Sequence, residues 1–118
     1  RDFIFVEDVV SLYARIARSL SEDPYKYRGE VYNAGTNRPT SVRSVINDVY
    51  TLISNEEALK DVESQMVGKL TVGEIEQQYM DYEKVNFDFG WKPKHDLQSG
   101  LLKTIEWFSG YLAKQHHL

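Results

Sequence analysis

Short runs of aromatic and β-branched residues alternate with amphipathic helical patterns along this chain, and the alternation constrains the fold more than any other feature. Residues 3–6 and 29–34 have the composition of strands. Apolar residues recur at helical spacing over about 8–19, and a second helical stripe consists of Val42, Val45, Ile46, Val49 and Ile53. The order strand, helix, strand, helix predicts the α/β class.

The middle of the chain has weaker patterns. Residues 62–67 have some strand character, and 68–78 have the composition of a loop. Asp81 is placed to cap a short helix, and Gly90 stands where a left-handed residue would end that helix. We therefore expect a loop between 68 and 78 and a short helix before Gly90.

Further polar residues and one glycine mark helix ends and contacts. Thr40 or Ser41 is placed to cap the helix that carries the second stripe, and Asp96 is placed to cap a last helix with an apolar face over 97–112. Gly100 inside that helix predicts close packing against another backbone. Asp8, like Asp81, is interpreted as a helix cap.

Composition excludes several classes of function. The 118 residues carry a net charge of −4 without any run of Lys and Arg, which argues against a nucleic-acid partner. The longest apolar stretch falls short of the roughly 20 residues of a membrane helix, so we expect a cytoplasmic protein without membrane contact. The absence of cysteine excludes disulfides and thiolate metal sites within the chain.

The motifs of a catalytic centre are missing from the sequence. No glycine-rich turn is present to approach a dinucleotide pyrophosphate, and the spacing of Gly68 and Gly73 is followed by Glu74 where a phosphate loop needs Lys. No Tyr has a Lys four residues later, and none of the three histidines has the partner arrangement of a nucleophilic triad. We therefore expect no catalytic, cofactor-binding or metal-binding residue in this chain.

Five segments stand in a recognisable order. They are RDFIFVEDVV at 1–10, GEVYNAG at 29–35, EIEQQYMDYEK at 74–84, FGWKP at 89–93 and LQSGLLKTIEW at 97–107. Together they resemble the extended short-chain dehydrogenase/reductases of the NAD-dependent epimerase/dehydratase family, which act on nucleotide sugars. The run at 74–79 is most similar to CDP-glucose 4,6-dehydratases and less similar to UDP-sugar 4-epimerases.

The resemblance implies a fold and a reaction. Residues 1–118 would form a single C-terminal nucleotide-sugar-binding region that includes the last strand and helix of a Rossmann-type enzyme, with the N-terminal NAD-binding half outside this chain. The complete enzyme would use NAD (or NADP) to oxidise C4 of the hexose, eliminate water across C5 and C6, and return the hydride to C6. The alternatives are a 4-epimerase, which returns the hydride to C4, and a non-catalytic module that binds a ligand or a protein.

The resemblance also implies which residues bind the nucleotide diphosphate sugar. Arg1 falls at the arginine that meets the diphosphate, with local pairing to Asp2 as the alternative. Glu74 falls at an acid near the ribose hydroxyls, with an exposed loop acid as the alternative. Tyr79 would line the same pocket or serve as a core aromatic. Thr71 replaces a second phosphate-binding arginine of the family, so that contact has no counterpart here.

Other residues and the assembly are interpreted structurally. Asn33, Gly35, Trp91 and Trp107 are expected to have structural roles. The two predicted strands would have exposed edges without the N-terminal half, and exposed edges favour self-association. We therefore expect a homo-oligomer.

Overall fold

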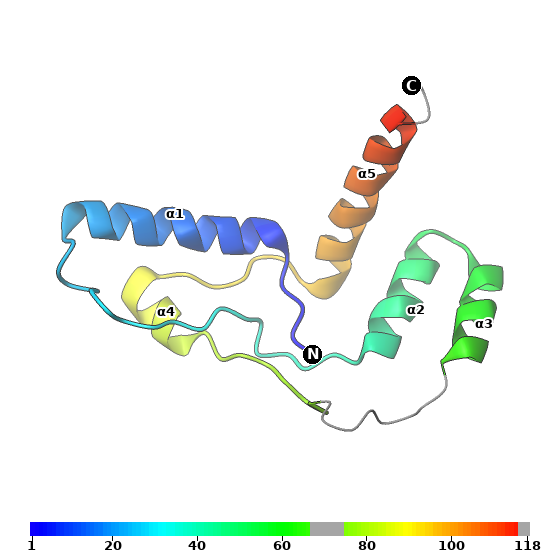
Figure 1. The fold of residues 1–118 in the computed structure, drawn as a ribbon, viewed down its shortest axis with the longest axis horizontal. Helices are drawn as coiled ribbons and strands as arrows, with labels where there is room; N and C mark the ends of the chain where they lie inside the picture. Colours follow the sequence, from blue (N-terminus) through cyan, green and yellow to red (C-terminus); the bar gives the residue numbers. More distant parts are fainter. Residues whose placement is uncertain (67–74, 116–118) are drawn as a thin grey trace.

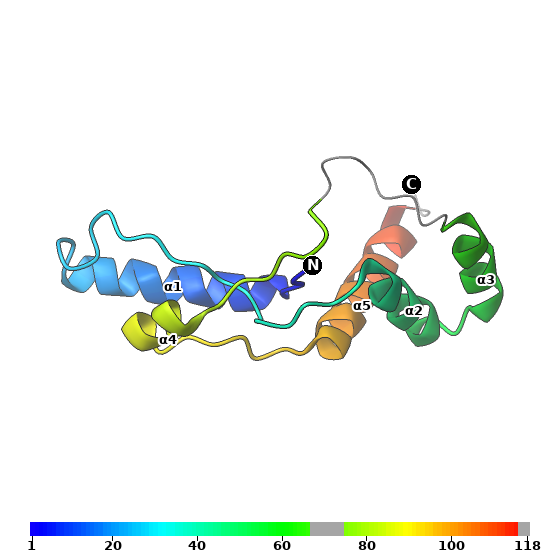
Figure 2. The ribbon, with the colours of Figure 1, turned by 90° about the horizontal axis from the view of Figure 1, so that it is seen from below.

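The computed structural model describes residues 1–66 and 75–115, in which five helices are joined by long extended segments (Figure 1). The helices are α1 (Val6–Glu22), α2 (Val42–Leu52), α3 (Glu56–Gln65), α4 (Glu83–Phe89) and α5 (Leu97–Gln115). Helix α1 packs against α4, and α2 packs against both α3 and α5. The two groups lie at opposite ends of the molecule, with the extended segments between them (Figure 2).

The predicted strands at 3–6 and 29–34 are wrong as hydrogen-bonded strands, since the described part of the chain contains none. Phe5 has extended backbone angles, and the main chains of Arg1 and Thr40 exchange two hydrogen bonds of 2.8 Å. That pairing ends because Asn37 adopts a left-handed conformation with φ of 55° and turns the chain. A strand needs a ladder of such pairs. Val6 is instead the first residue of α1, and Gly29 adopts a left-handed conformation with φ of 80°.

The predicted helix ends are mostly confirmed. The Ser41 side chain accepts a hydrogen bond of 3.0 Å from the Ser44 amide and caps α2. Gly90 ends α4 in the left-handed conformation with φ of 61°. Asp96 accepts a hydrogen bond of 2.8 Å from the Ser99 amide at the start of α5. Local polar chemistry therefore determines where these helices begin and end.

Two local predictions need correction. Residues 62–65, considered as part of a strand at 62–67, belong to helix α3, which the Asn55 side chain caps through the Ala58 amide. Two acids in the first turn add to the preference for helix there. Tyr82 rather than Asp81 is the residue before α4, although the Asp81 carboxylate still accepts a hydrogen bond from the Glu83 amide.

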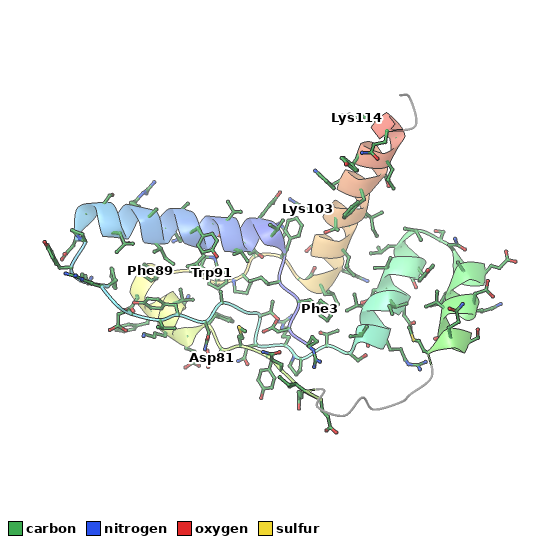
Figure 3. The ribbon with its side chains drawn as sticks, viewed as in Figure 1. Phe3, Asp81, Phe89, Trp91, Lys103 and Lys114 are labelled. Atoms are coloured by element: carbon green, nitrogen blue, oxygen red, sulfur yellow. The ribbon has the colours of Figure 1, made fainter. Side chains whose placement is uncertain are left out.

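The buried core is small and lies between α1 and α4. Leu12, Val85, Phe89 and Trp91 are its buried apolar residues. Tyr27 and Tyr32 pack against Phe89 in tilted and edge-to-face arrangements, with ring centroids 4.7 and 5.0 Å away. Figure 3 shows Phe89 and Trp91 beneath α1, on the side where α4 lies.

The molecule is open rather than compact. Its radius of gyration is 18.3 Å, whereas a compact domain of this length has about 13.5 Å. Large apolar side chains on α1 and α5 are exposed, including Val10, Tyr13, Trp107 and Phe108. Strand edges, the basis for the expected self-association, are absent from the described residues, but apolar patches of this kind also favour association.

The helices also bear on membrane contact. Among the residues described by the structure, no helix has both the length and the apolar character to cross a membrane.

Candidate functional site

The Asp2 carboxylate joins three segments that are far apart in the sequence. It accepts hydrogen bonds of 3.0 Å from the Thr36 amide, 3.2 Å from the Asn37 amide and 3.0 Å from the Met80 amide. The Thr36 hydroxyl donates a further hydrogen bond to it. Burial opposes ionisation of this carboxyl, but the hydrogen bonds from Thr36, Met80 and Asn37 outweigh burial and lower its pKa. We call Asp2 with these three partners the Asp2 anchor.

Gly35 makes the Asp2 anchor possible. A Cβ atom at this buried position would lie 2.4 Å from the Asp2 carboxylate and 2.7 Å from both the Cβ and the carbonyl oxygen of Met80. No side chain fits at such distances, so the chain needs glycine here. The structural role expected for Gly35 is confirmed, and its reason is close approach to a side chain and a neighbouring main chain.

Arg1 lies beside the anchor and contacts the segment that follows residue 74. Its guanidinium donates a hydrogen bond to the Ile75 carbonyl, and its main chain pairs with Thr40. The side chain is partly exposed at this position.

The other two predicted binding residues are placed differently. Tyr79 is 50% exposed, so its alternative role as a core aromatic is not seen in the described structure. Tyr79 directly precedes Met80, and Arg1 directly precedes Asp2. The hydrogen bond from the Met80 amide to Asp2 therefore brings the main chains beside Arg1 and Tyr79 together. Glu74 lies outside the described residues.

A cleft of about 520 Å³ opens next to the Asp2 anchor. Phe3, Thr36, Arg38 and Tyr82 line one part of it, and residues 93–98 line another. The volume is within the range of small-molecule sites, and the lining has cationic and anionic side chains together. Among the described residues, Arg1 and Tyr79 are not part of this lining, so the cleft adjoins the predicted binding residues without containing them.

A second buried carboxylate, Asp8, holds α1 to the segment before α5. Asp8 is 1% exposed and accepts hydrogen bonds from the His95 amide at 3.0 Å and from the His95 ring Nδ1 at 3.1 Å. Its carbonyl accepts a bond of 2.9 Å from the Trp91 indole. Burial opposes ionisation, but the hydrogen bonds from His95 and Lys94 and the charge of His95 lower the pKa of Asp8.

This arrangement corrects two expectations. Asp8 is not a helix cap, because it lies within α1, and no side chain caps that helix at Phe5. His95 does have an acidic partner, which the sequence did not indicate because 87 residues separate the two. The other ring nitrogen of His95 lies 3.8 Å from the Glu7 carboxylate and not beside a hydroxyl nucleophile. The pair therefore has a structural arrangement rather than that of a triad.

The roles expected for the two tryptophans differ in outcome. Trp91 is 1% exposed and donates to Asp8, so its structural role is confirmed. Trp107 is 62% exposed and stacks on Tyr111 with ring centroids 5.2 Å apart. Trp107 therefore takes no part in the core that the structure describes.

In the ranges 1–66 and 75–115, no three His, Cys, Asp or Glu side chains gather closely enough to hold a metal ion.

The chain is similar in sequence to several known proteins. It is 30% identical over 109 residues to dTDP-D-glucose 4,6-dehydratase of Mus musculus, covering 92% of this chain and 29% of that protein. It is 28% identical to a putative UDP-glucose 4-epimerase of Methanocaldococcus jannaschii, covering 91% and 30%, and 26% identical to dTDP-glucose 4,6-dehydratase of Escherichia coli, covering 92% and 29%.

The matches cover nearly all of this chain but only part of each relative. The chain spans about three tenths of the length of these curated relatives. No protein-family model matches it, and no solved structure matches it significantly. The chain is therefore similar to a part of each of these dehydratases and of this putative epimerase.

Proposed function

We propose that this chain is the nucleotide-sugar-binding portion of a sugar-nucleotide 4,6-dehydratase. The observation that carries the proposal is the similarity to dehydratases over 92% of the chain. The placement of Arg1 supports it, because a partly exposed guanidinium held at the Ile75 carbonyl can meet a diphosphate. A 4-epimerase is the second candidate, because the relatives also include a putative UDP-glucose 4-epimerase.

The residues of this chain would bind and orient the substrate. Arg1 would hold the diphosphate, Tyr79 would line the pocket, and Glu74 would accept from the ribose hydroxyls. The hydride carrier of such a reaction is NAD, and the residues present do not fit it because the chain has no glycine-rich turn. We therefore assign no hydride step to any residue here and place those steps in other parts of a longer protein.

The reaction is tested with the complete protein encoded by the gene. The protein is incubated with NAD and with dTDP-glucose, UDP-glucose or CDP-glucose, and the products are analysed by mass spectrometry and proton NMR. A 4,6-dehydratase gives a product lighter by one water with a new C6 methyl signal. An epimerase gives a product of unchanged mass with an inverted C4. No conversion of any of the three substrates contradicts both enzyme proposals and favours a binding module.

The assignment of Arg1 has its own test. Arg1→Ala in the complete protein is expected to weaken binding of the nucleoside diphosphate about tenfold or more, because it removes a charge-assisted contact. Arg43→Ala is the matched control, since Arg43 lies on α2 and pairs only loosely, at 3.9 Å, with Glu63. Isothermal titration calorimetry measures both variants. Equal affinities for Arg1→Ala and the unchanged protein would contradict the assignment.

A further inference from the structure

We infer that Asp2 is the positioning residue of the nucleotide-sugar site, and that it acts by holding Arg1 and the Tyr79 segment in one arrangement. The inference rests on the proposed function, because Arg1 and Tyr79 matter only if the site binds a nucleoside diphosphate. The observation that carries it is the anchor itself, in which one carboxylate binds main-chain amides from two other segments, 36–37 and the one at Met80.

The geometry couples Asp2 to both binding residues through the main chain. Asp2 follows Arg1, so fixing its carboxylate fixes the backbone from which the guanidinium projects. Met80 follows Tyr79, and its amide donates to Asp2 while its carbonyl accepts 3.2 Å from the Asn37 amide. Met80 therefore has both main-chain polar groups bound to the anchor and its surroundings. Movement of Asp2 would displace both neighbours together.

The charge on Asp2 is part of this role. Four donors converge on the carboxylate, three of them main-chain amides that cannot rotate away. An asparagine at this position can accept with one oxygen, but its NH2 group would face N–H donors. Gly35 lets the carboxylate approach closely, because a Cβ there would lie 2.4 Å from it. Asp2→Asn therefore keeps the size of the side chain and removes the arrangement of acceptors.

The experiment is a double-mutant cycle on the complete protein. The affinities of Arg1→Ala, Asp2→Asn and the double variant for dTDP, UDP and CDP are measured by calorimetry. Asp2→Asn is expected to weaken binding about tenfold, because hydrogen bonds to a charged group are lost. If Asp2 acts through Arg1, the double variant binds no more weakly than Arg1→Ala alone. If the loss of affinity in the double variant equals the product of the two single losses, Asp2 does not act through Arg1 and the inference is wrong.

Two further variants separate positioning from general stability. Asp8→Asn removes another carboxylate that accepts from main chain, but its partner is His95 and not Thr36, Asn37 or Met80. This variant should lower the unfolding temperature without changing nucleotide affinity. Thr36→Val removes only the hydroxyl bond to Asp2, retains the fold, and should weaken binding about threefold. If Thr36→Val and Asp2→Asn both leave the nucleotide affinity unchanged, the inference is wrong. It is also wrong if Asp8→Asn lowers the affinity as much as Asp2→Asn does.

The outcomes distinguish this inference from the proposed function. If the unchanged protein binds none of the three nucleoside diphosphates, or if Arg1→Ala has no effect, the proposed function fails and the inference falls with it. If Arg1→Ala weakens binding while Asp2→Asn does not, only the inference fails. If both weaken binding and the double variant matches Arg1→Ala, both stand.

Discussion

Replacing Gly35 by alanine tests how closely Asp2 and Met80 approach this residue. The added Cβ would lie 2.4 Å from the Asp2 carboxylate and 2.7 Å from two atoms of Met80, far inside ordinary contact distances. Part of that contact is to main chain, so rotation of a flexible side chain cannot relieve it. Either Asp2 or the Met80 segment must move, and the hydrogen bonds of the anchor break.

The expected cost follows from those bonds. Overpacking a filled site typically costs about 1–3 kcal/mol. Loss of hydrogen bonds to a charged group adds about 1.5–3 kcal/mol. We expect Gly35→Ala to lower the free energy of opening in this region by about 3 kcal/mol, with the two contributions overlapping because they come from one displacement.

Native-state hydrogen exchange of the complete protein measures this effect locally. The amides of Thr36 and Met80 should lose protection in Gly35→Ala, since they donate to Asp2. Gly110→Ala is the control with the opposite sign, because a Cβ there meets no atom within 4 Å and alanine stabilises a helix by about 0.5–1 kcal/mol. Protection at Thr36 and Met80 within about 0.5 kcal/mol of the unchanged protein would refute the reasoning.

Three other substitutions test separate parts of the fold. Asp8→Asn should destabilise the protein by about 2–3 kcal/mol near neutral pH. The pKa of Asp8 is lowered in the folded protein, so its stabilising effect is present above the ordinary value of 3.8 and is lost as the pH falls through the folded value. The free energies of unfolding of Asp8→Asn and the unchanged protein, measured with urea, should therefore become equal in acid. Trp91→Phe should cost about 2–3 kcal/mol by thermal unfolding, since a buried ring loses packing and its bond to Asp8, whereas Trp107→Phe should change the unfolding temperature little. Ser41→Ala should lower the stability of α2 by about 1 kcal/mol, seen as reduced exchange protection in that helix alone.

Local signals in the sequence predicted four of the five helices that the structure describes, but not α3. Ser41 with the apolar stripe that follows it located α2, and Gly90 located the end of α4, because capping and left-handed conformations depend on a few neighbouring residues. Gly100 also marks close packing as expected, but its neighbour is a side chain and not another backbone, since a Cβ there would lie 3.2 Å from the Cβ of Phe5.

The strands could not be predicted in the same way. An extended run becomes a strand only when another segment supplies hydrogen bonds, and this requirement is not visible in residues 3–6 or 29–34 alone. In the structure the Val31 carbonyl accepts from the Lys84 side chain at 2.9 Å instead of from a neighbouring strand. Pairing partners are a property of the whole fold.

The candidate site was predictable only in part. The resemblance of 1–10 and 74–84 to a family drew attention to Arg1 and Tyr79, but it did not indicate the role of Asp2, whose partners are 34 to 78 residues away. Likewise, Asp8 and His95 carry no local signal of their pairing. The one available signal was Gly35, a glycine after a strand-like run, which indicates close approach without identifying what approaches.

Because the two tryptophans have different surroundings, their fluorescence can report what covers each part of the chain. Trp91 is enclosed between α1 and α4, whereas Trp107 stands on the projecting half of α5. An aqueous quencher such as iodide should therefore reduce the emission of Trp107 and leave that of Trp91 nearly unchanged. Any partner that covers α5, whether the rest of a longer protein or a second copy, should protect the quenchable fraction and leave the buried one as an internal reference.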